Sequence, residues 1–139
     1  MNIVIIDGQG GQLGVQLIQK IKSNQIDSTI TAIGTNAIAT SSMLKAGANV
    51  GATGENPVIV ACRKADVIIG PIGIVIADSL HGEITPKMAL AVGQSDAVRI
   101  LLPMNKCDNI VAGTSSLSTS TIILLEIVVP FCCSAMYLL

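Results

Sequence analysis

The stretch that decides the fold is NIVIIDGQGGQLG, residues 2–14. Apart from Asn2 itself, the run from Asn2 to Ile6 is apolar and β-branched. Such a run is typical of a strand buried on both faces of a parallel sheet. The run ends at Asp7, and the glycine-rich segment from Gly8 to Gly14 follows. Apolar residues then recur at helical spacing, at Leu13, Leu17, Ile18 and Ile21. The stretch therefore predicts a strand, a tight turn and a helix over residues 11–23.

The same alternation continues along the chain. High β-propensity predicts strands over residues 28–33, 66–70 and 98–102, and helices are expected over 37–46, 57–65 and 86–94. Asn56-Pro57 and Thr85-Pro86 are good helix starts, because the first residue caps free amides and proline suits the first turn. Residues 72–80, IGIVIADSL, fit either a strand or the buried face of a short helix. The pattern predicts a single-domain, three-layer, Rossmann-like doubly wound α/β fold with a mostly parallel sheet.

Composition narrows the class of protein. The 139 residues suit one domain, and 50% of them are hydrophobic while only 12% are charged, about half the usual share. The net charge of −1 and the lack of a basic run exclude nucleic acid as an expected partner. So few charges leave apolar surface that a second subunit would cover, so we expect a homo-oligomer.

The first residues and the cysteines indicate a compartment. MNIVIID lacks the charged start, apolar run and cleavage site of a secretory signal. The cysteines show no CxxC spacing, so we expect no metal site; they stand at Cys62, Cys107, Cys132 and Cys133. Reduced thiols in a cytoplasmic protein are the expectation.

The glycine-rich turn is the expected ligand site. Its amides and the helix N-terminus favour an anion, although Gly8, Gly10, Gly11 and Gly14 fit the GxGxxG pattern only with one residue inserted. A dinucleotide site usually has an acid or an arginine at the end of the second strand, where this chain has Gly34-Thr35-Asn36. The ligand expected is therefore a nucleotide or a small phosphorylated metabolite. The alternative is a turn that only packs helix on strand.

Strand ends of a parallel sheet meet at one edge, where ligands bind. The expected binding residues at that edge are Gly8, Gly10, Gly11, Gly14, Gly34, Thr35, Asn36, Gly70, Gly73 and Asn105.

A small enzyme is the alternative function. Its candidate catalytic residues are Asp7, Glu55, His81 and Cys107, with Lys106 near the substrate. His81 stands between two acids, Asp78 and Glu83, which favours acid–base chemistry, and the cation beside Cys107 favours the thiolate. Four of these residues also have a structural interpretation: Asp7 as a cap of the first helix, His81 as an incidental loop residue, Cys107 as a buried inert thiol and Lys106 as a solvated side chain. A third possibility is an oligomeric scaffold or regulatory module without catalysis.

Six ordered segments carry a family resemblance: MNIVIIDGQGG, ITAIGTNAIATSSMLKAGA, GATGENPVIV, DVIIGPIGIVIADS, GEITPKMALAVGQS and ILLPMNKC. They resemble a family of short bacterial proteins that is carried as a domain of unknown function. The resemblance covers about residues 1–113. It implies a compact Rossmann-like cytoplasmic protein and assigns neither ligand nor catalytic residues.

Residues 114–139 form an apolar tail that departs from the family pattern and contains one charge, Glu126. Residues 121–139 are nearly long enough to span a bilayer as a helix, but Glu126 and Pro130 argue against an anchor. We expect the tail to complete or extend the domain of residues 1–113. A membrane anchor and an altered reading frame are the alternatives.

Overall fold

Five parallel strands form one sheet in the computed structural model, which describes residues 1–104, 109–114, 118 and 123. The strands are β1 (Asn2–Asp7), β2 (Thr29–Gly34), β3 (Val50–Thr53), β4 (Val67–Pro71) and β5 (Val98–Leu102). The helices are α1 (Gln12–Ser23), α2 (Ala37–Lys45), α3 (Glu55–Cys62), α4 (Pro86–Gly93) and the short 3-10 helix η1 (Ile72–Val75). The sheet order is β3-β2-β1-β4-β5. This is a doubly wound α/β fold, as predicted.

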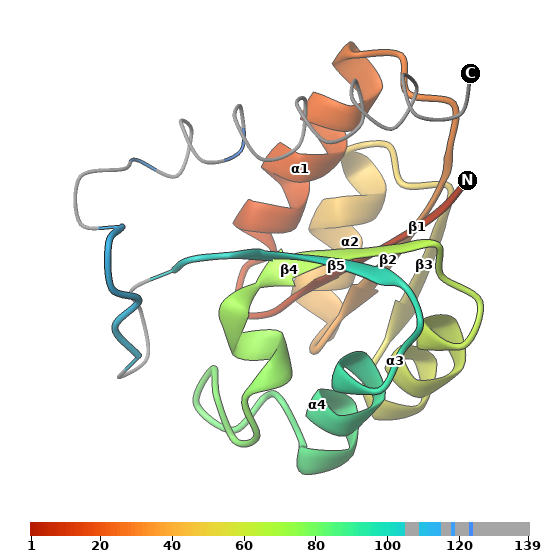
Figure 1. The fold of residues 1–139 in the computed structure, drawn as a ribbon. Helices are drawn as coiled ribbons and strands as arrows, with labels where there is room; N and C mark the ends of the chain where they lie inside the picture. Colours follow the sequence, from red (N-terminus) through yellow and green to blue (C-terminus); the bar gives the residue numbers. More distant parts are fainter. Residues whose placement is uncertain (105–108, 115–117, 119–122, 124–139) are drawn as a thin grey trace.

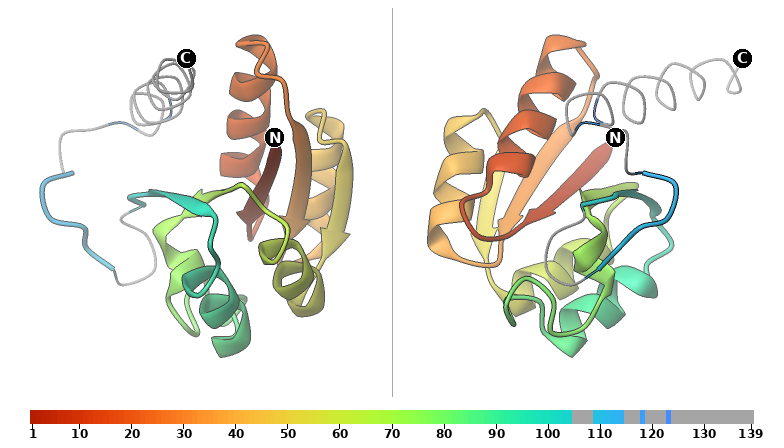
Figure 2. Two further views of the ribbon diagram at one scale, coloured as in Figure 1. Left: turned by 45° about the vertical axis from the view of Figure 1, so that its right-hand side comes forward. Right: turned by 90° about the vertical axis from the view of Figure 1, so that its left-hand side faces the viewer.

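Helices cover both faces of the sheet. α1 and α2 lie on one face, and α3, η1 and α4 lie on the other (Figures 1 and 2). β1 is the central strand and pairs with β2 along its whole length, from Asn2 opposite Thr29 to Asp7 opposite Gly34. On its other side, β1 pairs with β4. The order of the strands therefore reverses at β1, between the neighbours β2 and β4.

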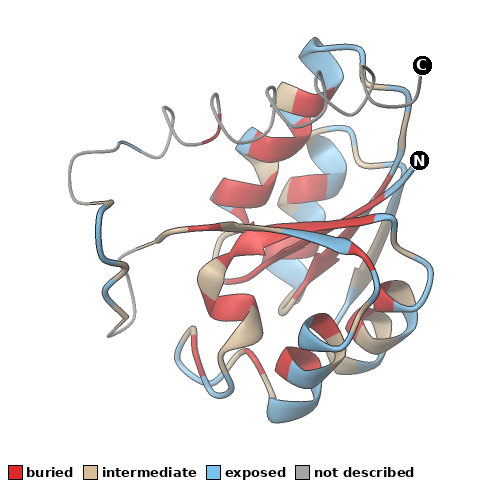
Figure 3. Ribbon diagram, in the orientation of Figure 1, coloured by how far each residue is buried: buried red, intermediate tan, exposed pale blue. Residues whose placement is uncertain are grey.

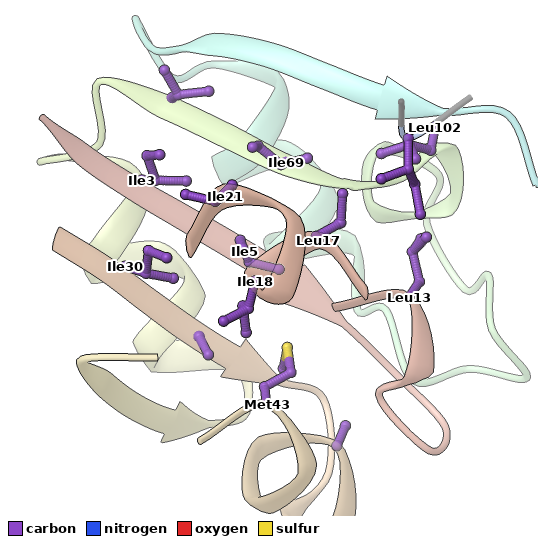
Figure 4. Packing of buried hydrophobic residues seen from close by; sticks show 14 residues of the cluster. Ile3, Ile5, Leu13, Leu17, Ile18, Ile21, Ile30, Met43, Ile69 and Leu102 are labelled. Atoms are coloured by element: carbon purple, nitrogen blue, oxygen red, sulfur yellow. The ribbon is translucent and has the colours of Figure 1, made fainter. Parts of the chain in front are cut away.

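β1 is buried along most of its length (Figure 3), and its alternating side chains supply the core on both faces. Ile3 and Ile5 pack with α1 and α2, as Figure 4 shows, whereas Val4 and Ile6 pack with α3 and α4. Ile3 and Ile5 are completely buried, and each such side chain is worth about 1.5–3 kcal/mol of hydrophobic stabilisation. The described members of both clusters are aliphatic and sulfur-containing side chains, with no aromatic ring among them.

Three local predictions need correction. β3 was not expected, because its sequence VGAT is short, contains two small residues and is only partly buried at the sheet edge. α3 begins at Glu55, after Gly54 with a φ of 100°, so Asn56 lies within the first turn rather than capping it. The same helix ends at Cys62, earlier than residue 65. The ambiguous residues 72–80 form η1 and then a loop.

The loop of residues 76–85 joins η1 to α4 and is called the β4–α4 loop below. Three of its non-glycine residues have a positive φ, namely Asp78, Leu80 and His81. Several hydrogen bonds hold this backbone; among them, the amide of Asp78 donates to the carbonyl of Ile84 at 2.8 Å, and the buried hydroxyl of Ser79 donates to the carbonyl of Gly73. These bonds therefore fix the loop to its own end at Ile84 and to η1.

Most of the tail of residues 114–139 lies outside the described residues. The three interpretations of the tail, as part of the domain, as a membrane anchor or as an altered reading frame, therefore concern residues outside the described part of the chain. Ile123 is described and is buried in the cluster that contains Leu13 and Leu102. Within the described part of the chain, no helix is long and apolar enough to cross a membrane.

Candidate functional site at the carboxyl end of the sheet

A cavity of about 260 Å³ opens at the carboxyl ends of β1 and β4. It is lined by the β1–α1 turn from Asp7 to Leu13 with Gln16, by Pro71 to Gly73, by Ser79 and Leu80, and by Met104 and Asn109. Because the strand order reverses at β1, this is the position at which open α/β sheets bind ligands. The fold therefore places the predicted glycine-rich turn at the expected crevice.

Gly11 is required by the geometry of the turn. It has a φ of 71° and is the N-cap residue of α1, with no side chain of its own to cap the helix, and its amide donates to the carbonyl of Gly8 at 2.9 Å. A Cβ atom at Gly11 would lie 2.8 Å from the backbone of Ala39, so α2 packs against bare backbone there. At Gly10, by contrast, a Cβ atom would meet only the Cγ of Gln12, at 3.9 Å. The missing side chain of Gly11 allows α2 to pack closely against the turn, whereas the missing side chain of Gly10 leaves space beside the cavity.

The carboxylate of Asp7 holds the turn from its buried side. Its Oδ1 accepts the amide of Gly8 and its Oδ2 accepts the amide of Gly14, both at 2.8 Å. Burial raises the pKa of Asp7, and the hydrogen bonds from the amides of Gly14 and Gly8 oppose that rise. Asp7 thus caps the first turn of α1, as the structural interpretation expected. The amides of Gly10 and Gln12 have no hydrogen-bond partner among the described residues.

Glu83 of the β4–α4 loop reaches the opposite side of the same turn. Its Oε2 accepts the amide of Gln9 at 2.8 Å, the hydroxyl of Thr35 and the Nδ2 of Asn36 at 3.3 Å. Partial burial acts to raise the pKa of Glu83, but the hydrogen bonds from Thr35, Gln9 and Asn36 and the nearby His81 outweigh it and lower the pKa. Glu83 therefore remains a carboxylate that is fixed by groups from two other segments.

Asn36 connects the ends of β1 and β2. Its Oδ1 caps α2 by accepting the amide of Ala39, and its Nδ2 donates to the carbonyl of Gln9, both at 2.9 Å. Thr35 and Asn36, which were predicted to bind ligand, do meet the glycine-rich turn, but Glu83 occupies their donor groups. Gly34 lies behind them at the end of β2, packed against Thr40.

The other predicted residues are distributed around this edge. Glu55 accepts the hydroxyl of Thr85 at 2.6 Å and forms an ion pair with Lys87 at 3.7 Å, and it does not line the cavity. His81 is exposed on the β4–α4 loop. Gly73 lines the cavity, whereas Gly70 lies within β4.

Asn105, Lys106 and Cys107 lie outside the described residues. Of the catalytic candidates that are described, Asp7 alone lines the cavity, and no acid–base pair meets there. In the same part of the chain, no group of three His, Cys, Asp or Glu side chains is placed to hold a metal ion.

Sequence reasoning did not find several lining residues. Ser79 and Leu80 reach the cavity because the β4–α4 loop folds back, and Met104 and Asn109 come from the segment after β5. Glu83 was noticed only as a neighbour of His81. It carries no local signal, because 48 residues separate it from Thr35.

The sequence matches the family model described as "Domain of unknown function (DUF3842)" over residues 2–130, and the chain belongs to this family. The match continues past residue 113, where we expected the resemblance to end. No curated protein matches the chain.

Among solved structures, the chain is similar to a dodecameric FMN-dependent UbiX-like decarboxylase from Escherichia coli O157:H7. The identity is 18% and the TM-score is 0.49, over 96% of this chain and 76% of that chain. This similarity is too weak to transfer a ligand, an activity or an assembly.

Proposed function

We propose that the chain binds a nucleotide or a small phosphorylated metabolite in the cavity beside the glycine-rich turn. The observation that carries this proposal is the pair of amides of Gly10 and Gln12. They lie beside the cavity, one in the turn and one at the first residue of α1, and have no partner among the described residues, whereas Asp7 binds the amides of Gly8 and Gly14. Unpaired amides at a helix N-terminus attract an anionic group.

The size of the cavity limits how much of the ligand it holds. Pockets that enclose a whole drug-sized ligand measure about 300–1,000 Å³, and this cavity measures about 260 Å³. One part of the ligand would therefore occupy the cavity, and the rest would extend along the open edge of the sheet.

The charges of the residues around the cavity also restrict which ligands are expected to bind. The described lining residues include no Lys or Arg, and the carboxylates of Asp7 and Glu83 lie close to the turn. Among the described residues, a phosphate would be held by backbone amides, neutral side chains such as Ser79 and the helix dipole, which are weaker than a charged side chain. We therefore expect mono- and diphosphates to bind in preference to triphosphates.

A thermal-shift screen with nucleoside mono-, di- and triphosphates and sugar phosphates tests this proposal. A ligand at about 100 times its dissociation constant adds about 2.7 kcal/mol to the free energy of unfolding, which raises the melting temperature by several degrees. Gly10→Val places a side chain over the amides and should abolish the shift. The matched control is Gly93→Val at the end of α4, where an added Cβ has no neighbour within 4 Å. The proposal is wrong if none of these compounds shifts the wild type.

We also infer that the chain forms a homo-oligomer. Both edge strands expose apolar side chains, with Val50 of β3 50% exposed and Val98 of β5 64% exposed. Unpaired strand edges and exposed apolar side chains favour association with a second copy. Light scattering on dilution tests this inference, and a particle that remains monomeric at the highest soluble concentration contradicts it.

A further inference from the structure

Glu83 occupies the place in the fold where a ribose-binding acid is expected. In doubly wound dinucleotide sites, an Asp or Glu about 20 residues after the glycine-rich turn accepts hydrogen bonds from the ribose. In this chain the end of β2 is Gly34-Thr35-Asn36, which has no acid. The structure brings the Glu83 carboxylate to Thr35 and Asn36 from the β4–α4 loop.

The two carboxylate oxygens of Glu83 are used unequally. Oε2 accepts the amide of Gln9, the hydroxyl of Thr35 and the Nδ2 of Asn36. Oε1 has a single and long contact in the described part of the chain, with the Nδ2 of Asn36 at 3.4 Å. The side chain is half-buried, so one oxygen remains available to a ligand while the other fixes the carboxylate.

Gly8 permits this arrangement. A Cβ atom on Gly8 would lie 2.6 Å from the Oε2 of Glu83, so the end of β1 and the carboxylate approach each other across a position without a side chain. The Glu83 carboxylate and the Gly10 and Gln12 amides thus meet at the same turn, with the acid on the β2 side and the cavity on the β4 side.

We propose that Glu83 binds the ribose of a ribonucleotide, accepting hydrogen bonds from its 2′- and 3′-hydroxyls while the phosphate lies at the amides of Gly10 and Gln12. This inference rests on the proposed function and adds the diol as the feature that is recognised. A carboxylate only accepts hydrogen bonds and repels a phosphate. A hydroxyl donor is therefore the part of the ligand that suits this position.

The experiment compares ADP and GDP with their 2′,3′-dideoxy counterparts by calorimetric titration. The proteins are the wild type, Glu83→Gln and the control Asp78→Asn, which removes an exposed carboxylate from the same loop. Removal of the diol should weaken binding about tenfold or more in the wild type and in Asp78→Asn. In Glu83→Gln the same change should weaken binding less than about threefold, because the charged acceptor is lost.

Each other result overturns the inference. Equal binding of the two ligand types to the wild type shows that the diol is not recognised, and this comparison needs no variant to fold. Tighter binding of both ligand types by Glu83→Gln shows that the charge of the carboxylate repels the ligand instead of binding it. Binding of sugar phosphates but of neither nucleotide overturns the inference and leaves the proposed function intact. If no phosphorylated compound binds, both proposals are wrong.

Discussion

The carboxylate of Asp7 accepts the backbone amide of Gly14 at 2.8 Å, and this bond joins the end of β1 to the first turn of α1. It spans the glycine-rich turn from beneath, so the turn is fixed before any ligand arrives. A side chain that sequence reasoning considered for catalysis is therefore also a structural element of the site. The predictions below separate these two roles.

Asp7→Ala should lower the free energy of unfolding by about 2–3 kcal/mol, because it leaves the amides of Gly8 and Gly14 without their charged acceptor. Urea denaturation of the two proteins measures the difference. Asp27→Ala is the control, since Asp27 is exposed before β2, and it should change stability by less than about 0.5 kcal/mol. Equal effects of the two substitutions would contradict the capping role of Asp7.

The contribution of Glu83 to the free energy of unfolding should be lost at acid pH. The pKa of Glu83 is lowered from 4.5, so the unfolded chain binds the proton first as the pH falls. The contribution is complete above pH 4.5 and is lost as the pH falls through the pKa of the folded state. The difference in unfolding free energy between wild type and Glu83→Gln should therefore shrink on acidification, as measured by urea titrations across this range.

Asp7 should show the opposite dependence. Its pKa is raised above 3.8 by burial, so the folded chain holds the proton more tightly than the unfolded chain. The wild type should lose stability relative to Asp7→Asn as the pH rises from 3.8 through the pKa of the folded state. The same titrations measure this difference. A stability difference that grows with pH would show that the amides of Gly8 and Gly14 outweigh burial.

Gly11→Val should destabilise the fold by about 2–4 kcal/mol, since it combines a positive φ with a clash against the backbone of Ala39. Gly10→Ala should cost less than about 1 kcal/mol, because the added methyl group makes only an ordinary contact. Thermal or urea denaturation separates the two variants. Similar losses of unfolding free energy in the two variants would mean that Gly10 is also required for packing. Gly10 would then be a poor position for binding tests.

Cys62 should resist thiol reagents in the folded protein. Burial raises the pKa of its thiol to about 11, and the side chain lies in the core beneath α3. Labelling with iodoacetamide at pH 8, followed by peptide mapping, should leave Cys62 unmodified until urea is added. Rapid labelling of the native protein at this position would show that the α3 side of the core opens readily.

Much of the fold could be predicted because β1 and α1 carry strong patterns. The apolar run after Asn2 arises because β1 is buried on both faces. The helical spacing from Leu13 to Ile21 arises because α1 is buried on one face. β3 escaped prediction because a short edge strand with Gly51 and Ala52 buries little and needs no apolar run. The start of α3 was misplaced because Gly54, not Asn56, makes the turn into the helix.

The site could be predicted only in part, for a physical reason. The glycine-rich turn lies between a strand and a helix that are adjacent in sequence, so its position follows from local pattern. Glu83 reaches the turn through a loop in which Asp78, Leu80 and His81 adopt positive φ values, and these residue types give at most a weak sequence signal for this conformation. Contacts between segments that are distant in sequence depend on the path of that loop.

The alternation of isoleucines along β1 also gives the protein a convenient set of spectroscopic reporters. Ile3 and Ile5 face one helical layer and Ile6 faces the other, and the described residues of both clusters include no aromatic ring whose current would shift the methyl resonances irregularly. Selective labelling of isoleucine δ1 methyl groups would therefore place nuclear magnetic resonance probes in both layers, directly behind the turn that begins at Asp7. A ligand that binds on either side of that turn would be detected from within the core, without a substitution.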